Sequence, residues 1–336
     1  MRSKKTLSTF SNKVWKVQFT FLNEENFIRI VPIVPVDARW SKIGVTVAGG
    51  NGRGMATNQL NGPLGLFIDD DQTMIIADTG NHRVMQWTVG DKNGQVVAGG
   101  NGRGNDLHRL DSPIHALIDK ATDSLLICDR GNRRVLQWSR HEGTTHGEIL
   151  LNNISCCGLA MDDQRYLYVS DVDQHEVRRY KVGERNGIVV AGGHGKGFGL
   201  HQLNDPFYIF VDREQTVYVS ETSIHRVVKW YKGAKEGIIA AGGHGVGNTM
   251  LQFTYPEGLF VDALGTVYVA DQYNHRVMRW TKGASQGTIA VGEYGKGATQ
   301  YNLNMPYAVS LGRYGDLYVV DNNNNRIQRF SLEKNI

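Results

Sequence analysis

The chain has 336 residues, a formal net charge of +4 and a pI near 8.8. Its 40 glycines make up about 12% of the residues, against an average of about 7%, whereas proline (7) and cysteine (3) are scarce. This composition excludes a collagen-like chain, a proline-rich linker and a fold built on disulfides or cysteine-rich zinc modules. No apolar run reaches the roughly 18 residues of a membrane span, and the basic start lacks the apolar core of a secretory signal. We therefore expect no membrane association and, by default, a cytoplasmic protein.

An eleven-residue pattern recurs along the chain. Its clearest copies are Ala77–Trp87, Cys128–Trp138 and Ala270–Trp280, and less regular copies span 170–180, 220–230 and 320–330. The acidic residue of each copy (Asp78, Asp129, Asp171, Glu221, Asp271 and Asp321) follows the previous one by 51, 42, 50, 50 and 50 residues. Six copies at a nearly constant period indicate one repeat architecture rather than two unrelated domains.

Each repeat contains four short apolar runs separated by Gly, Asp or Asn. In the first repeat these runs are Leu64–Ile68, Met74–Ala77, Arg83–Trp87 and Gln95–Ala98. Runs of four or five residues rich in β-branched and aromatic side chains predict strands, because they are too short for helices. Four strands per unit of about 40–50 residues are typical of a β-propeller blade.

The number of strands predicts how the ring closes. The sixth repeat has its first three strands, and then the chain ends without a fourth. A surplus copy of that strand, Val45–Ala48, lies ahead of the first repeat and can complete the last blade, which hides the open edges. The sequence therefore predicts an all-β, six-bladed propeller over 41–331, with a five-residue tail at 332–336. The extension at 1–40 contains two alternating runs, 14–21 and 27–31, that could form a β-hairpin.

The repeats resemble those of the NHL-repeat family. The pattern is clearest in Pro256–Asp262, Val267–Asp271 and Asn274–Val277, and the resemblance covers 41–331. It implies a six-bladed propeller that binds a partner, as a protein scaffold or an RNA-binding region. One amidating lyase shares the repeat and holds a metal with several histidines at the ring centre, so the resemblance also admits a metal-dependent enzyme.

Polar residues recur in the turn between the second and third strands of most repeats. Asp and Asn cap tight turns, and Arg can bond that Asp or nearby carbonyls, so we interpret these residues as structural. They are Asp78, Asn81, Arg83, Asp129, Asn132, Arg134, Asp271, Asn274, Arg276, Asp321 and Arg326. Repeat three departs from the pattern and has no Arg, and repeat four has Glu221 and Ile224 in place of Asp and Asn.

A glycine-rich segment, Ala48–Gly54, follows the fourth strand and returns at 98–104, 191–197, 241–247 and, more loosely, 291–297. A nucleotide site is not predicted, because no helix follows the glycines. These loops and the repeat turns fall on one face of the ring, which we call the top face. Its candidate binding residues are Arg53, Arg103, Lys196, His194, His244 and Lys296.

The connection between repeats two and three breaks the pattern. Residues 148–154 lack the glycine-rich loop, and Cys156 occupies the place of the usual proline. Cys128 lies at the end of a strand in the preceding repeat. We favour reduced, packed thiols here, with a Cys128–Cys156 disulfide as the alternative, since sequence does not fix the Cα separation.

The positions just after the proline of each inner strand predict the lining of the channel mouth. The candidate binding residues there are His115, Cys157, Phe207, Tyr208, Glu257 and Tyr307. His115 and Glu257 belong to blades that face each other across the ring. One inner-strand histidine does not make a zinc site, which needs three protein ligands, so we predict no catalytic residue, metal or cofactor.

These observations favour a monomeric, non-catalytic scaffold that binds a protein or other ligand through its top face. RNA binding by that face is the first alternative. A metal-dependent enzyme centred on His115 and Glu257 is the second.

Overall fold

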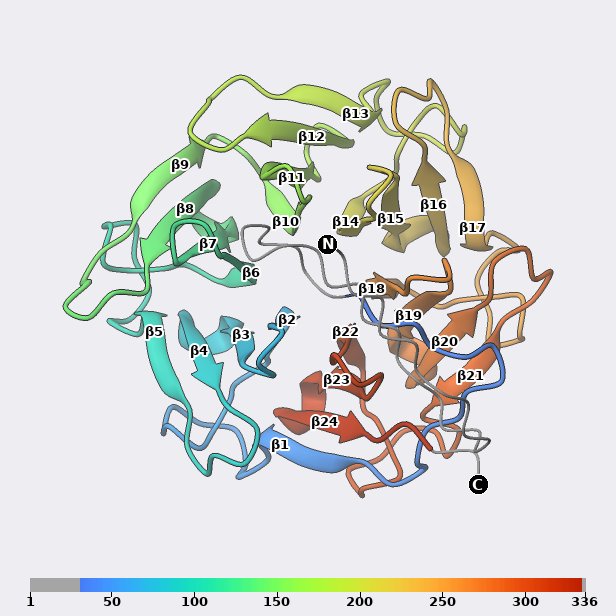
Figure 1. Cartoon of the computed structure of the whole chain (residues 1–336), viewed down its shortest axis with the longest axis horizontal. Helices are drawn as coiled ribbons and strands as arrows, with labels where there is room; N and C mark the ends of the chain where they lie inside the picture. The colour runs from blue at the N-terminus through green and yellow to red at the C-terminus, as the bar shows by residue number, and fades with distance from the viewer. Residues whose placement is uncertain (1–30, 334–336) are drawn as a thin grey trace, which may run out of the picture.

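The computed structural model describes residues 31–333 and contains six four-stranded antiparallel sheets arranged as the blades of a ring (Figure 1). In the first three blades the strands follow chain order from the inner to the outer edge. Blade 1 is β2 (Leu66–Ile68), β3 (Met74–Asp78), β4 (Arg83–Trp87) and β5 (Gln95–Gly99). Blade 2 is β6 (Pro113–Asp119), β7 (Ser124–Asp129), β8 (Arg134–Ser139) and β9 (Glu148–Asn152). Blade 3 is β10 (Cys156–Met161), β11 (Tyr166–Asp171), β12 (Glu176–Lys181) and β13 (Ile188–Gly192).

The remaining blades are built in the same way. Blade 4 is β14 (Pro206–Val211), β15 (Val217–Glu221), β16 (Arg226–Trp230) and β17 (Ile238–Gly242). Blade 5 is β18 (Pro256–Val261), β19 (Val267–Asp271), β20 (Arg276–Trp280) and β21 (Thr288–Val291). Blade 6 is β22 (Pro306–Leu311), β23 (Leu317–Asp321), β24 (Arg326–Phe330) and, from the other end of the chain, β1 (Val45–Gly49).

The ring closes as the sequence predicts. β1 pairs antiparallel with β24, with Val45 opposite Arg329 and Thr46 opposite Gln328 (Figure 1). The six-bladed architecture and its closing strand are thereby confirmed.

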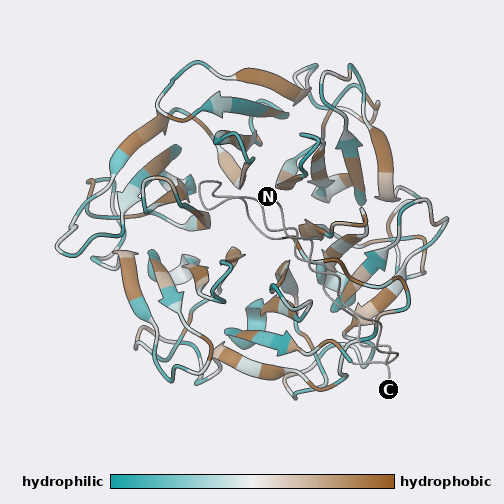
Figure 2. Cartoon of the chain, viewed as in Figure 1, coloured by the Kyte–Doolittle hydropathy of each residue, from teal (hydrophilic) through white to brown (hydrophobic). Residues whose placement is uncertain are grey.

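The burial pattern explains why these runs form strands. In blade 1 the second and third strands are almost fully buried, whereas the side chains of the outer strand are only partly covered. Figure 2 shows that the outer strands nevertheless carry many hydrophobic residues. The aromatic residue that ends each third strand is buried, and in blade 1 this residue is Trp87. Its ring lies so close to Gly94 that an added Cβ there would be 2.3 Å from a ring carbon, so the turn into β5 requires glycine.

Residues 31–40 extend along blades 5 and 6. Val34 and Trp40 are buried, the Trp40 indole donates to the Gly315 carbonyl at 2.9 Å, and Ala263 N–H donates to the Pro32 carbonyl at 3.1 Å. The hairpin expected further upstream lies outside the described residues, apart from Val31.

Five three-residue 3-10 turns are the helical elements within 31–333. They are η1 (Thr79–Asn81), η2 (Arg130–Asn132), η3 (Thr222–Ile224), η4 (Gln272–Asn274) and η5 (Asn322–Asn324). In this part of the chain no helix has the length and apolar character required to cross a bilayer.

Candidate functional site

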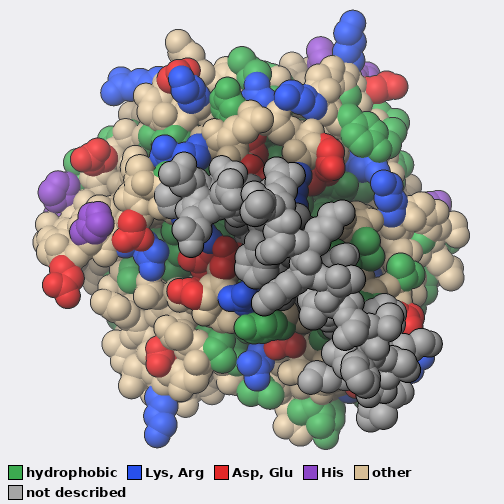
Figure 3. Space-filling model, in the orientation of Figure 1, with side chains coloured by type: hydrophobic (Ala, Val, Ile, Leu, Met, Phe, Trp, Pro, Cys, Tyr) green, Lys and Arg blue, Asp and Glu red, His purple; other side chains and the backbone are tan. Residues whose placement is uncertain are grey.

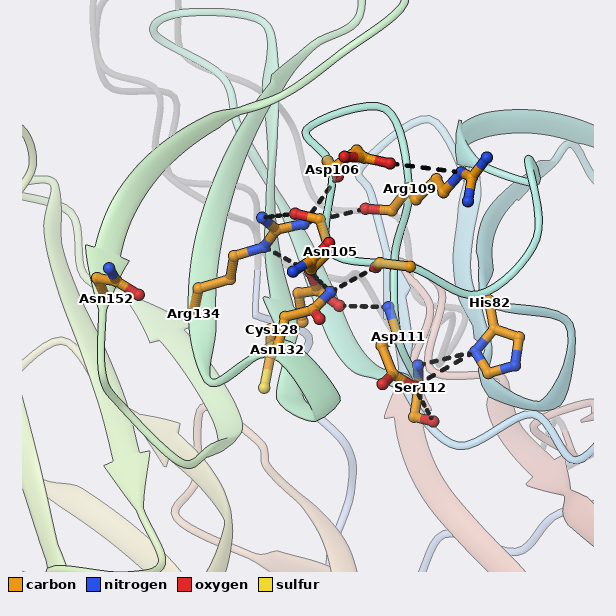
Figure 4. Close-up of polar contacts among 12 residues, drawn as sticks. His82, Asn105, Asp106, Arg109, Asp111, Ser112, Cys128, Asn132, Arg134 and Asn152 are labelled. Carbon is orange, nitrogen blue, oxygen red and sulfur yellow. Dashed lines mark hydrogen bonds and ion pairs between the residues drawn. The ribbon is translucent and has the colours of Figure 1, made fainter.

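The repeat arginines hold the glycine-rich loops on the top face. In blade 2, Arg134 Nε donates to Asp129 at 2.7 Å, and the rest of the guanidinium reaches three carbonyls of the loop that enters the blade (Figure 4). These carbonyls belong to Asn105, Asp106 and Arg109, at 2.7, 3.1 and 3.1 Å. A buried ion pair is thus combined with a set of charge-assisted bonds to the backbone of the loop.

This contact recurs in five of the six blades. The arginine Nε lies 2.5–2.8 Å from its carboxylate in each pair, namely Arg83–Asp78, Arg134–Asp129, Arg226–Glu221, Arg276–Asp271 and Arg326–Asp321. Four repeat asparagines add a bond of 2.8 Å to a loop glycine carbonyl, from Asn81, Asn132, Asn274 and Asn324. These residues therefore fix the shape of the top face.

The cations expected to bind partners on the top face are largely engaged within their own loops. Arg53 bonds the Asn61 side chain at 2.6 Å, Arg103 pairs with Asp111 at 3.0 Å, and Lys196 pairs with Asp205 at 3.1 Å. His194 packs on another histidine of its loop, His244 lies 3.2 Å from the Gly242 carbonyl, and Lys296 forms a β-bridge with Leu303. The charges of Arg103 and Lys196 are thus balanced within their own loops, whereas the contact of Arg53 is to a neutral amide and that of Lys296 involves its backbone.

The connection between blades 2 and 3 contains a disulfide. Cys128, at the end of β7, is bonded to Cys156, at the start of β10, with a Cα–Cα distance of 5.8 Å. Our preference for reduced thiols was therefore wrong. The two strands approach each other because the short 153–155 connection brings blade 3 directly against blade 2 without an intervening loop.

A hydrogen-bonded pair crosses the central channel. Leu159 N–H donates to His115 Nδ1 at 3.0 Å, which leaves Nε2 to carry the proton toward the Tyr208 hydroxyl at 2.9 Å. That hydroxyl donates in turn to the Leu66 carbonyl at 3.4 Å. The network joins the inner strands of blades 1 to 4. His115 is thus directed at blades 3 and 4, and no bond of this network involves Glu257.

Neighbouring strands come close at this level. A Cβ at Gly65 would lie 2.3 Å from the Ile114 carbonyl oxygen, so no larger residue fits there. His115 and Tyr208 are the large, buried and hydrogen-bonded side chains at this level, and both line the cavity described below.

Four further predicted channel residues gather in the top part of the channel. Each stands one position after the residue at the proline place: Cys157, Phe207, Glu257 and Tyr307. The rings of Phe207 and Tyr307 meet edge to face with centroids 5.8 Å apart. Cys157, Glu257 and Tyr307 are all buried.

Arg130 completes this group and was missed from the sequence. It begins η2, contacts Cys157 Sγ, and its guanidinium carbon lies 5.7 Å from the Phe207 ring centre. The corresponding residues Thr79 and Thr222 are small and bond the proline carbonyl of the next blade. A comparison of the six residues that directly follow the repeat acids would have identified Arg130, because it is the one basic residue at these six positions. We call Arg130, Cys157, Phe207, Glu257 and Tyr307 the top channel cluster.

Burial controls the protonation of this cluster. It raises the pKa of Glu257 well above its ordinary value, although the charge of Arg130 and a hydrogen bond from Thr222 act in the opposite direction. Burial likewise raises the pKa of Cys157 to about 12 against the field of Arg130, and it raises the pKa of Tyr307. These shifts favour the neutral forms of the carboxylic acid, the thiol and the phenol beside the guanidinium of Arg130.

The bottom part of the channel opens into a cavity of about 850 Å³. His115 and Tyr208 lie at its inner end, and Phe67, Phe210 and Phe260 line its interior. Its rim is formed by the turns after the inner strands, at 119–121, 162–165, 212–214 and 262–265. Figure 3 views this face and shows acidic and basic side chains around its centre. This cavity therefore opens on the face opposite to the one on which we expected binding.

Side chains that bind metals do not cluster in the described part of the chain. Within residues 31–333, no three His, Cys, Asp or Glu side chains are placed to hold one metal ion.

Comparisons with known proteins agree with this fold. A six-bladed ring of four-stranded sheets around a central channel defines a β-propeller. Residues 253–279 match the model of the NHL repeat. The chain is thus a six-bladed β-propeller that contains a match to the NHL repeat in blade 5. No curated protein sequence is significantly similar to the chain.

Solved structures of several kinds of protein share the architecture. An auxiliary nutrient binding protein from Bacteroides thetaiotaomicron has 14% identity and a TM-score of 0.68, over 89% of this chain and 78% of that one. A gluconolactonase from Xanthomonas campestris has 14% identity and a TM-score of 0.59, over 91% and 100%. An inactive virginiamycin B lyase from Staphylococcus aureus, with quinupristin, has 12% identity and a TM-score of 0.55, over 88% and 88%. At such identities the likeness extends to the fold alone, and the fold serves both binding proteins and enzymes.

Proposed function

We propose that the protein is a non-catalytic binding propeller that takes a small organic ligand into the cavity on its bottom face. The single observation that carries this proposal is the cavity of about 850 Å³ whose inner end is closed by the hydrogen-bonded pair of His115 and Tyr208. Its volume falls within the range of about 300–1,000 Å³ that is usual for small-molecule sites.

The lining of the cavity supports an amphipathic ligand. Phenylalanine rings in the interior offer apolar contact area, while the rim carries polar groups that could fix a ligand's orientation. Several of these rim groups are already held in place: Arg165 bonds Asp119 at 2.7 Å, and Lys120 pairs with Asp69 at 2.9 Å. A rim with fixed side chains loses little freedom when a ligand binds.

The test uses the neutral fluorescent probe N-phenyl-1-naphthylamine and the full chain. Ala263 is exposed at the cavity rim, and Ala234 is exposed in the turn between β16 and β17, outside the cavity lining. We expect Ala263→Trp to weaken probe binding at least about tenfold by obstructing the entrance, a loss of about 1.4 kcal/mol. The matched variant Ala234→Trp should bind the probe as the wild type does.

Two outcomes would overturn the proposal. One is the absence of saturable probe binding to the wild type, and the other is an equal loss of binding in both variants. Thermal unfolding of each variant establishes that the ring is intact before binding is measured.

The top face remains a second candidate, for a protein partner. It is favoured by the five loops that repeat arginines hold in a defined shape, since a preformed surface binds at lower entropic cost. Partner capture should be lost in a variant with Arg53→Glu and Lys196→Glu and kept in Ala263→Trp. Binding of RNA by the same face would instead show affinity that falls steeply with salt concentration.

A further inference from the structure

Arg130 differs from the five repeat arginines in having no carboxylate partner within the described part of the chain. Each of the repeat arginines has a buried acid within 2.8 Å of Nε. Arg130 forms no ion pair within 4.0 Å among residues 31–333, although it is half-buried. Its neighbours are a thiol and an aromatic ring, from Cys157 and Phe207. The positive charge of this half-buried guanidinium is therefore not balanced by a carboxylate within ion-pair distance in that part of the chain.

Glu257 supplies a second, independent sign of a ligand site. Its side chain is only 6% exposed, and its Oε2 atom has no hydrogen-bond partner within the described part of the chain. Leaving such a group without a partner costs free energy, and buried polar atoms normally have one. The top channel cluster therefore contains both an unbalanced cation and an unsatisfied carboxyl group.

The protonation of the cluster decides which ligand it suits. Burial raises the pKa of Glu257 well above its ordinary value, which favours the neutral form of this carboxyl group, the form that can donate its O–H. The Tyr307 phenol is protonated for the same reason. Two hydroxyl donors and a guanidinium fork match the two oxygens and the negative charge of a carboxylate. A cationic ligand would instead face Arg130 without an anion to offset it.

The exposed end of the cluster is at Arg130, which begins the top-face turn η2. Arg130 and Phe207 are partly exposed, whereas Glu257 and Tyr307 lie deeper. His115 and Tyr208 line the bottom cavity, whereas the residues of this cluster are not part of its lining.

We propose that Arg130, Glu257 and Tyr307 bind the carboxylate group of a small organic acid in the top part of the channel, with Phe207 in contact with the apolar part of the ligand. This site is separate from the bottom cavity and does not depend on the function proposed for it.

The experiment titrates the full chain with propionate at constant ionic strength, using sodium chloride and propionamide as the charge and shape controls. We expect saturable binding of propionate and none of propionamide. Arg130→Met should weaken binding by at least about tenfold, because a hydrogen bond to a charged group contributes about 1.5–3 kcal/mol. Arg133→Met is the matched control: Arg133 follows η2 directly, is exposed and pairs with Asp173, so its loss should leave the affinity unchanged.

Two further measurements test the role of Glu257 and whether the bound carboxylate belongs to a free acid or to a chain terminus. Glu257→Gln keeps a neutral donor and should bind propionate within about threefold of the wild type, without the loss of affinity that the wild type shows at alkaline pH. N-acetylglycylglycine presents the same group on a peptide end. Tighter binding of this compound than of propionate would assign the carboxylate to a chain terminus, and weaker binding would assign it to a free acid.

The proposal is overturned if the wild type does not bind either carboxylate, or if Arg130→Met binds them as the wild type does. Arg130→Lys keeps the charge but loses the fork, and a loss of about threefold or more in this variant supports the proposal even where Arg130→Met proves unstable. The bottom-cavity variant Ala263→Trp should bind propionate normally, so failure of one site is distinguishable from failure of the other.

Discussion

Blade 5 and blade 3 show what a repeat retains and what it can lose. In blade 5, Arg276 bonds Asp271 at 2.8 Å and three carbonyls of the preceding glycine-rich loop, those of Asn248, Thr249 and Gln252. In blade 3, Glu176 occupies the place of this arginine, and the preceding loop is absent. The four strands of blade 3 nevertheless pair in the same order.

The difference teaches that the repeat arginine serves the loop rather than the blade. Every blade that is entered by a glycine-rich loop has the arginine, and the single blade entered by a short connection lacks it. Sheet formation therefore depends on the buried strands, whereas the shape of the top face depends on the arginines.

Removal of a repeat arginine should cause the largest loss of stability. Arg276→Ala leaves Asp271 buried without its partner, so we expect a loss of about 3–5 kcal/mol in the free energy of unfolding, measured with urea. Lys181→Ala is the comparison in blade 3, where both side chains of the pair are exposed and Lys181 lies 3.3 Å from Glu184. It should cost about 0–1 kcal/mol. Equal losses in the two variants would contradict our interpretation of the repeat arginine.

We expect the second-largest loss of stability from removal of the disulfide. Blade 3 begins with a bonded Cys156 where blade 5 begins with Pro256, and the bridge closes a loop with a sequence separation of 28. We expect reduction, or the double variant Cys128→Ser with Cys156→Ser, to lower the free energy of unfolding by about 2–4 kcal/mol. The double variant should be insensitive to added dithiothreitol, and a wild type equally insensitive would argue against the bridge.

We expect a smaller effect on stability at Glu257, the residue that follows Pro256 in blade 5. Its pKa is raised in the folded protein, so its contribution to stability is complete below the pKa of the unfolded chain and is lost as pH rises through the folded-state pKa. Glu257→Gln removes this dependence. The variant should gain stability relative to the wild type as pH increases between about 5 and 9. Parallel urea midpoints across this range would show that Glu257 does not titrate as we infer.

The equivalent residue in blade 3, Cys157, should give the smallest response. Because burial raises the pKa of this thiol to about 12, little thiolate exists at neutral pH. We expect no measurable reaction with Ellman's reagent in the folded protein and one reactive thiol after unfolding in urea. The Cys157→Ala variant should give no signal in either state, and rapid labelling of the native wild type would reveal an accessible thiolate.

The sequence was sufficient for the fold because the repeat imposes it. The spacing of acidic residues such as Asp271 and Asp321 indicated six units, and the surplus run at Val45–Ala48 had one vacant edge to occupy. The glycine-rich loops and their arginines could also have been related beforehand, since both are missing together around blade 3.

The candidate site was less accessible to sequence reasoning. Position in the inner strand predicts Glu257 and Tyr307 beside the channel, but it could not orient Arg130, which lies in a turn of another blade. The partners of His115 are equally unpredictable, because its bonds to Leu159 and Tyr208 depend on how three inner strands converge. The disulfide required a Cα separation that no spacing in the sequence supplies.

The closing pair of strands also determines how the ring would respond to mechanical tension. Val45 of β1 lies opposite Arg329 of β24, and the two chain segments beyond them stay adjacent, with Ser41 N–H bonded to the Ser331 carbonyl at 2.8 Å. A force that pulls these two segments apart therefore acts across the ladder and breaks its hydrogen bonds one after another, as in a zipper. Traction on the flanking chain would thus open blade 6 first and leave the other five sheets folded.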